Sequence, residues 1–216
     1  MTEQLWSAVD RYITETLLGD DAGLEETLRA TAASGLPAIN VSPPQGKQLH
    51  LLARMIGARA ILEIGTLAGY SAIWMARALP AGGRLVTLEV DAKHAAVARD
   101  NIARAGLSDR AEVIVGRALD TLPSLKGPFD FFFIDADKAS IPEYFQWALR
   151  LSRSGSVIIV DNVVRGGAVI DEGGDAAVQG VRRLNEVLST EKRVSATTIQ
   201  TVGSKGYDGF TMALVG

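Results

Sequence analysis

The chain is organised around one stretch, Ala60-Ile-Leu-Glu-Ile-Gly-Thr-Leu-Ala-Gly-Tyr-Ser71. A short aliphatic run reaches Ile64, two glycines then break it, and helix-forming residues follow from Ser71. This order predicts a strand, a glycine turn and a helix. In an open parallel sheet such a turn lies at the carboxyl ends of the strands, where ligands bind, and glycine lets a ligand approach the backbone closely. A plain turn without a ligand has the same pattern, because two glycines at this spacing are common.

Glu63 adds information about the ligand. It lies one residue before the end of the predicted strand, close to the expected start of the helix. A carboxylate at this place repels phosphate and attracts hydrogen-bond donors such as hydroxyl and ammonium groups. The stretch therefore favours a nucleoside-like ligand that has no pyrophosphate.

From residue 60 onward the chain alternates aliphatic runs with helical patterns, which predicts a doubly wound α/β fold. Phe131-Phe-Phe-Ile134 and Val157-Ile-Ile-Val160 are apolar on both faces, which is typical of central strands in a parallel sheet. The predicted strands are residues 60–64, 84–90, 111–115, 129–134 and 156–160. The predicted helices between them are residues 69–78, 94–105, 118–122 and 142–151.

Two amphipathic helices, at residues 5–18 and 24–33, precede this repeat. Their apolar faces either cover the sheet or pack on a second subunit, and the sequence leaves both arrangements open. Two later segments match the capping box, in which a serine and a polar residue three positions on satisfy the first backbone donors of a helix. Ser42 with Gln45 predicts one helix start, and Ser140-Ile-Pro-Glu143 predicts another.

The chain changes character after the strand predicted at 156–160. Residues 161–175 are rich in glycine and acidic residues, which predicts a mobile loop over the ligand site. A helix at 176–189 follows. Two extended runs at 194–202 and 210–215, with glycines between them, predict an antiparallel hairpin that closes the edge of the sheet.

Composition limits the classes of protein to consider. A chain of 216 residues predicts one domain, residues 1–216, with a helical extension (1–57) and a sheet core (58–216). A net charge of -3, with acids and bases interspersed, gives no electrostatic footprint for nucleic acid or an anionic membrane. The absence of cysteine excludes disulfides and thiol catalysis and fits a reducing compartment. Without a signal-peptide pattern or a long apolar run, we expect a cytoplasmic protein.

Glu89 is the first candidate ligand-binding side chain beyond the glycine turn. It lies near the end of the second predicted strand, where a carboxylate can accept hydrogen bonds from ribose hydroxyls. This position favours a nucleoside ligand. It does not separate nicotinamide cofactors from S-adenosylmethionine, and a solvated carboxylate at a strand end is the simpler alternative.

Two polar clusters follow buried strands and are expected in the same crevice. Asp135 begins the first cluster, and Asp161-Asn162 is the second. Two carboxylates and an amide oxygen make a hard oxygen site suited to Mg²⁺, with positions left for water and substrate oxygens. Lys138 would then meet a substrate hydroxyl. The alternative for Lys138 is a structural salt bridge with Asp135 or Asp137.

Other catalytic arrangements are missing from the sequence. No tyrosine has a lysine four residues later, which argues against a short-chain dehydrogenase, and no Gly-x-Ser-x-Gly motif occurs. His50 and His94 lie far apart in predicted helices, where we expect surface residues rather than zinc ligands or bases. Trp74 and Trp147 lie on helices that pack against the sheet, and we expect both in the core.

Three motifs carry a family resemblance: the 60–71 stretch, Phe-Ile-Asp-Ala-Asp-Lys138 and Val-Asp-Asn162. In this order and spacing they resemble the cation-dependent class I O-methyltransferases of the caffeoyl-CoA and catechol type. The similarity covers almost the whole chain. It implies a mostly parallel seven-stranded sheet of order 3-2-1-4-5-7-6 with the last strand antiparallel, which agrees with the hairpin expected from the sequence.

The resemblance also implies roles for individual residues. The methyl donor, S-adenosylmethionine, would be held by Val41, Glu63, Gly65, Thr66, Ser71, Glu89, Ala118 and Asp135. Divalent metal, Mg²⁺ or else Ca²⁺ or Mn²⁺, would be held by Asp135, Asp161 and Asn162, with Lys138 as general base. Relatives of the plant type often carry glutamate where this chain has Gln45.

The activity implied by the resemblance is methylation of a vicinal dihydroxy aromatic molecule, by attack of a phenolate on the sulfonium methyl group. A homodimer is the implied assembly. Two other classes use the same sheet: an oxidoreductase with a nicotinamide cofactor, and a noncatalytic module that binds S-adenosylmethionine or mediates dimerisation. The first lacks a third glycine at the usual spacing, and the intact acidic clusters argue against the second.

Overall fold

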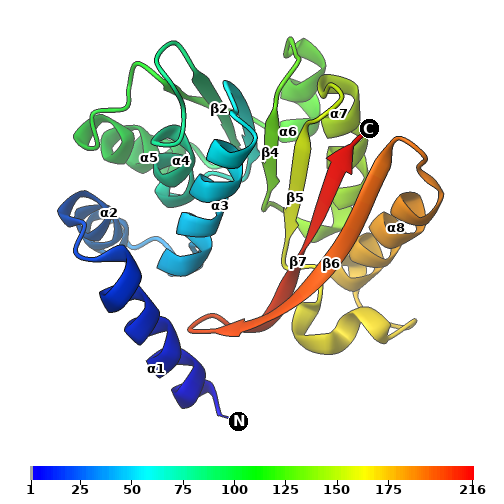
Figure 1. The fold of residues 1–216 in the computed structure, drawn as a ribbon, viewed down its shortest axis with the longest axis horizontal. Coiled ribbons are helices and arrows are strands. Elements are labelled where there is room, and N and C mark those ends of the chain that lie inside the picture. Colours follow the sequence, from blue (N-terminus) through cyan, green and yellow to red (C-terminus); the bar gives the residue numbers. More distant parts are fainter. Residues whose placement is uncertain (1) are drawn as a thin grey trace.

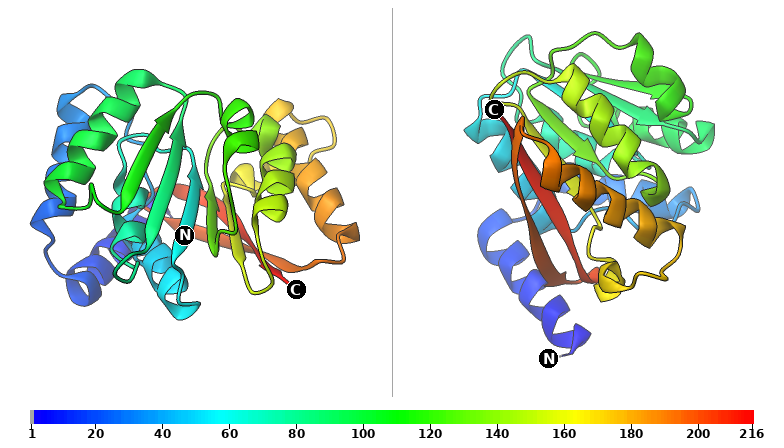
Figure 2. Two further views of the ribbon diagram at one scale, coloured as in Figure 1. Left: turned by 90° about the horizontal axis from the view of Figure 1, so that it is seen from above. Right: turned by 90° about the vertical axis from the view of Figure 1, so that its right-hand side faces the viewer.

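The computed structural model describes residues 2–216 and contains one mixed sheet of seven strands between two layers of helices (Figures 1 and 2). The strand order is β3-β2-β1-β4-β5-β7-β6, and β7 runs antiparallel to both of its neighbours. The predicted fold is therefore confirmed. The strands are β1 (Ala60–Ile64), β2 (Arg84–Glu89), β3 (Ala111–Val115), β4 (Phe131–Ile134), β5 (Val157–Asp161), β6 (Val194–Gly203) and β7 (Gly206–Val215).

Helices cover both faces of the sheet, and each face has its own hydrophobic core. Those that pack on one face are α2 (Ala22–Ala33), α3 (Pro43–Met55), α4 (Tyr70–Ala76) and α5 (Ala92–Arg104). Those that pack on the other are α6 (Ala118–Thr121), α7 (Ile141–Leu151) and α8 (Ala176–Thr190). Because β1 to β5 run parallel, the loops that follow them lie together at the carboxyl-terminal end of the sheet.

Central strands are buried on both sides because their side chains alternate between the two cores. In β4, Phe131 and Phe133 pack into one core and Phe132 into the other, and all three are fully buried. Burial of such a side chain stabilises the fold by about 1.5–3 kcal/mol relative to exposure. The buried apolar side chains fix the positions of the central strands. The backbone positions of the polar residues that directly follow these strands are therefore also well defined.

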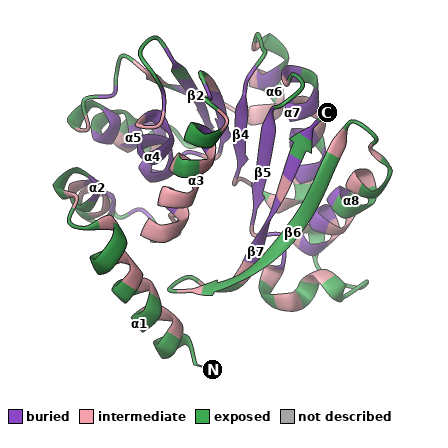
Figure 3. Ribbon diagram, in the orientation of Figure 1, coloured by how far each residue is buried: buried purple, intermediate pink, exposed green. Residues whose placement is uncertain are grey.

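The N-terminal extension divides into a covering part and an exposed part. α2 buries Leu24, Thr27 and Thr31. α1 (Glu3–Ile13) buries none of its residues and projects from the rest of the molecule (Figure 3). The single helix expected at 5–18 ends at Ile13 and continues as a π-helical turn, Thr14–Leu18.

One capping box is half right and the other is wrong. Ser42 Oγ accepts from the backbone N–H of Gln45, but the Gln45 side chain points elsewhere, to Asp161. Ser140 caps nothing with its side chain, because Lys138–Ser140 already forms a 3₁₀ turn whose cap is Asp137. The chain enters α7 from a turn and not from an extended segment, so the box geometry is not available.

Two further boundaries differ from expectation. β7 begins at Gly206, four residues earlier than predicted, because the hairpin turn is tight and the whole glycine-containing run pairs with β6. The glycine-rich segment after β5 contains a 3₁₀ helix, η4 (Arg165–Ile170), that packs beside β7.

Among residues 2–216, no helix combines the length and apolarity required to cross a membrane.

Candidate active site

A cavity of about 700 Å³ opens at the carboxyl ends of β1, β2, β4 and β5. This volume is in the range of small-molecule and cofactor sites. The sequence-predicted residues that line it are Val41, Gly65, Thr66, Ser71, Glu89, Ala118, Asp135, Lys138 and Asn162. Glu63 and Asp161 are not lining residues; both are buried next to residues that are, Ser71 and Asn162.

The turn after β1 requires glycine at position 65. Gly65 has φ of 98°, and a Cβ atom placed there would lie 2.1 Å from the carbonyl oxygen of Asp135. Only a residue without a side chain allows the β1 turn and the end of β4 to come this close. The turn that the sequence predicted for ligand approach also brings Asp135 to its place at the cavity.

Glu89 organises the same turn. Its Oε2 accepts hydrogen bonds from the backbone N–H groups of Thr66 (3.1 Å) and Leu67 (2.8 Å), and its Oε1 accepts from Asp91 N–H (3.0 Å). Leu67 has a left-handed backbone, φ 49°, which these bonds hold in place. The sequence predicted a ligand-binding role for Glu89 and missed this structural one.

Glu63 is completely buried behind the cavity wall. Ser71 Oγ donates to its Oε1 at 2.5 Å and Thr87 Oγ1 donates to its Oε2 at 2.6 Å. Burial raises the pKa of Glu63 to about 8, although the two hydroxyl donors act in the opposite direction. Contact with the methionine part of a cofactor stays a prediction, since Ser71 and not Glu63 reaches the cavity.

Replacing Glu63 with glutamine should stabilise the ligand-free protein at neutral pH. Its native pKa lies above the ordinary value of 4.5, so the native state binds more protons than the unfolded state between about pH 4.5 and 8. The free energy of unfolding of the wild type therefore falls as pH rises through this window. Glu63→Gln removes that loss, on the order of 3 kcal/mol at pH 7.

Urea unfolding at pH 4.5 and pH 8 measures this effect. The variant and the wild type should differ little at the lower pH and most at the higher pH. Parallel pH profiles for the two proteins would contradict a raised pKa at Glu63.

Asp135 and Lys138 form an ion pair in the wall of the cavity. Lys138 Nζ donates to Asp135 Oδ1 at 2.7 Å, so the salt bridge considered from the sequence is present. Gly180 of α8 fixes the lysine from the other side, because a Cβ atom there would lie 1.9 Å from the Lys138 carbonyl oxygen. Both partners therefore have defined backbone positions, set by two close-approach glycines.

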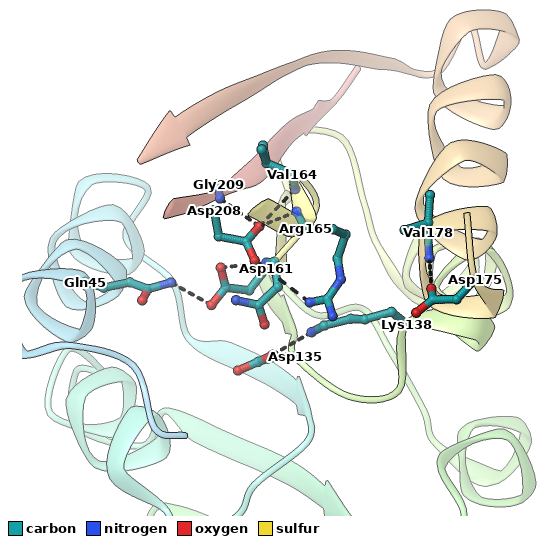
Figure 4. Close-up of polar contacts among 11 residues, drawn as sticks. Gln45, Asp135, Lys138, Asp161, Val164, Arg165, Asp175, Val178, Asp208 and Gly209 are labelled. Atoms are coloured by element: carbon teal, nitrogen blue, oxygen red, sulfur yellow. Dashed lines mark hydrogen bonds and ion pairs between the residues drawn. The ribbon is translucent and has the colours of Figure 1, made fainter. Parts of the chain in front are cut away.

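Asp161 is buried, and both of its hydrogen-bond partners are neutral donors. Its Oδ1 accepts from the Asn162 backbone N–H at 2.8 Å, and its Oδ2 accepts from Gln45 Nε2 at 2.6 Å (Figure 4). Burial raises the pKa of Asp161 to about 7, and the charge of Asp135 adds to this effect. Asp135 and Asp161 are thus two carboxylates close enough to repel each other.

This arrangement fits a divalent cation. A cation would neutralise the repulsion, and its oxygen ligands would be the two carboxylates with the Asn162 amide, a set that hard ions accept. No group of three acidic, cysteine or histidine side chains suited to a metal occurs within residues 2–216. A donor set of two carboxylates and one amide would leave coordination positions for oxygens from solvent or substrate.

Several residues at the cavity had no role in the sequence analysis. Tyr144 donates a hydrogen bond to Asp137, and burial raises the pKa of the Tyr144 hydroxyl. His94 is in α5 as expected, but it lines the cavity with Nδ1 3.8 Å from Glu89 Oε1. Arg165 enters from η4. No local motif distinguishes these residues, because each reaches the cavity through the packing of a separate element.

Comparison with known proteins gives consistent results. The O-methyltransferase family model matches residues 14–214. The chain is 54% identical to a catechol O-methyltransferase of Niastella koreensis, over all of both chains, and 55% identical to one of Mycobacterium tuberculosis, over 96% of this chain and 94% of the other. An O-methyltransferase from Bacillus cereus, solved in complex with SAH, is 58% identical and superposes with a TM-score of 0.98 over all of both chains.

The cavity, the sheet order and these relatives agree on the class of protein. The match covers nearly the full length of the chain and includes every sequence-predicted residue that lines the cavity. The chain belongs to the O-methyltransferase family and not to the nicotinamide oxidoreductases.

Proposed function

We propose that the protein transfers a methyl group from S-adenosylmethionine to one hydroxyl of a vicinal dihydroxy aromatic molecule, in a reaction that requires a divalent cation. One observation carries the proposal: the glycine turn after β1, the Asp135–Lys138 ion pair and Asn162 line a single cavity, and Asp161 is buried directly behind Asn162, close enough to Asp135 for the two carboxylates to repel. The Bacillus cereus relative was solved with SAH, and two relatives over 50% identical are named catechol O-methyltransferases.

The donor half of the site is the β1 turn with the ends of β2 and β3. Gly65 and Thr66 offer backbone close to the cavity, Glu89 offers a carboxylate for ribose hydroxyls, and Ala118 bounds the region for adenine. Val41, from the segment before α3, also lines the cavity. Asp135 stands between the two halves, where it can accept a hydrogen bond from the methionine ammonium group.

The cation would be held by Asp135, Asp161 and Asn162. When bound, Mg²⁺, Ca²⁺ or Mn²⁺ supplies Lewis acidity that lowers the pKa of an aromatic hydroxyl at the site. Gln45 donates to Asp161 Oδ2 and carries no charge, so it orients the carboxyl group without competing with a cation for its charge. The buried setting strengthens these interactions because little water screens them.

Lys138 is the residue placed to receive or shield the proton of the reacting hydroxyl. The phenolate oxygen then forms a bond to the methyl carbon as the carbon–sulfur bond breaks, and the electron pair of that bond stays on sulfur. The products are the aryl methyl ether and S-adenosylhomocysteine, whose sulfur no longer carries a charge. Holding oxygen and methyl carbon in line can contribute about 7–11 kcal/mol, by analogy with intramolecular reactions.

Removal of divalent cations should abolish methylation of a catechol such as caffeate. Excess chelator takes away the Lewis acid, so the hydroxyl keeps its proton at neutral pH. Added Mg²⁺ should restore the rate, and SAH binding measured by calorimetry in chelator should persist. Full activity in chelator would contradict the cation requirement.

The exposed α1 suggests that the protein forms a homodimer. Leu5, Val9 and Tyr12 are 49%, 47% and 67% exposed on a helix that buries none of its residues. Apolar side chains gathered in this way typically mark an interface. We expect sedimentation of a dimer for the wild type and of a monomer for Leu5→Glu combined with Val9→Glu. A monomeric wild type would contradict the proposal.

A further inference from the structure

We propose that Arg165 binds a carboxylate carried by the methyl acceptor, so that the preferred substrates are dihydroxy aromatic acids and not neutral catechols. This inference rests on the proposed function and adds the chemical class of the acceptor.

Arg165 lines the part of the cavity proposed to hold the methyl acceptor, which we call the acceptor end. It shares the cavity wall with Asp135, Lys138 and Asn162, and about a third of its side chain (33%) is exposed. Figure 4 shows the side chain reaching from the start of η4 toward the region between Asp161 and Lys138. A molecule held at the carboxylate pair would therefore pass close to the guanidinium group.

The backbone of Arg165 is held in an unusual conformation. Its φ is 57°, a left-handed value that residues with a side chain rarely adopt. Asp208 maintains it: one oxygen, Oδ1, accepts from the N–H groups of Val164, Arg165 and Gly209, each at 2.9 Å. Strain held this firmly is typical of functional sites, and here it aims the side chain into the cavity.

The guanidinium group has donors to spare. Within residues 2–216 its charged partner is Asp208 Oδ2 at 3.8 Å, which is too long for a hydrogen bond. Asp208 is occupied with the three backbone donors, so it orients the arginine without saturating it. A planar fork of unfilled N–H groups in a cavity is suited to bidentate recognition of a carboxylate.

Two cationic side chains, Lys138 and Arg165, line the cavity beside Asp135 and Asn162. Lys138 donates to Asp135 at 2.7 Å, whereas Arg165 lies 3.8 Å from Asp208, so Arg165 keeps N–H groups for an acceptor carboxylate.

Matched pairs of acceptors test the inference. We would measure kcat/KM for 3,4-dihydroxybenzoate and caffeate and for their methyl esters, which keep the diol and lose the charge. The acid-to-ester ratio should exceed one for the wild type and fall by about tenfold to a hundredfold in Arg165→Met, the range expected for a charged hydrogen bond. Arg165→Lys should lie between the two.

Two further variants sharpen the result. Asp208→Asn keeps an oxygen for the backbone donors and removes the competing charge, so its acid-to-ester ratio should rise. Arg150→Met removes a charge from an exposed position over the Trp147 ring and should leave the ratio as in the wild type. Melting temperature and SAH affinity identify any variant that fails to fold.

The outcomes separate the two proposals. If the wild type methylates acids and esters but Arg165→Met keeps the wild-type ratio, the carboxylate site is wrong and the proposed function stands. If the wild type methylates neither set with Mg²⁺ present, both proposals fail. A reduced ratio that is confined to the Arg165 variants supports the site.

Discussion

Asp161→Ala should lower kcat for a catechol acceptor by about 10²–10³-fold. Asp161 is one of the two carboxylates expected to hold the cation, and it is the buried one. Its removal takes away a ligand and leaves the donors of Gln45 and Asn162 without their acceptor. The reacting hydroxyl would then keep its proton at neutral pH.

The donor half of the site should survive this change. Asp161 does not line the cavity, and Gly65 and Glu89 hold the turn without it. Calorimetry should therefore find SAH affinity close to that of the wild type and a much weaker affinity for Mg²⁺ or Mn²⁺. Asp109→Ala, at a side chain that is 73% exposed, serves as the matched control. Unchanged turnover in Asp161→Ala would remove this residue from the site.

Lys138→Met should lower kcat by about 10²–10⁴-fold, the usual range for loss of a general base. Lys138 pairs with Asp135 and faces the cavity, so the variant loses either a proton acceptor, if the amine is neutral during turnover, or a positive charge beside the phenolate, if it stays an ammonium. Its rate should recover as pH rises toward the pKa of a free phenol, about 10, because the acceptor then ionises without help.

Lys138→Arg separates the two roles of the side chain. Arginine keeps the charge and cannot take a proton at accessible pH. If the lysine shields the phenolate, Lys138→Arg should keep much of the activity; if it accepts the proton, this variant should be as slow as Lys138→Met. Lys192→Met, at an exposed position, is the control. A methionine variant as fast as the wild type at neutral pH would exclude both roles.

Local pattern was sufficient for the main elements of the fold. Period-two burial of the phenylalanines in β4 and the glycine break after Ile64 depend on residues a few positions apart. The proximity of Asp135 and Asp161 was also predictable, because each residue lies at the carboxyl end of one of two neighbouring parallel strands. Prediction failed at Ser140, where a preceding 3₁₀ turn changed the geometry of the helix start.

Contacts between segments far apart in the sequence could not be predicted from local sequence patterns. Gln45 reaches Asp161 across 116 positions of sequence, and Asp208 caps the backbone of Val164 across 44. Both depend on how α3 and the β6–β7 hairpin pack against the sheet. The capping-box pattern even suggested a different partner for Gln45, because it considered only the nearest backbone donors.

By itself the sequence determined the alternation of strands and helices, the hairpin at the sheet edge and the glycine turn that lines the cavity. Hydrophobic period and glycine position act over a few residues, and the resemblance to a family supplied the rest. Only the tertiary structure decided how deeply Glu63 is buried, which donors hold Asp161 and that Arg165 points into the cavity. Burial, charge proximity and hydrogen bonding are properties of neighbours in space, and it is these neighbours that set the pKa of each group.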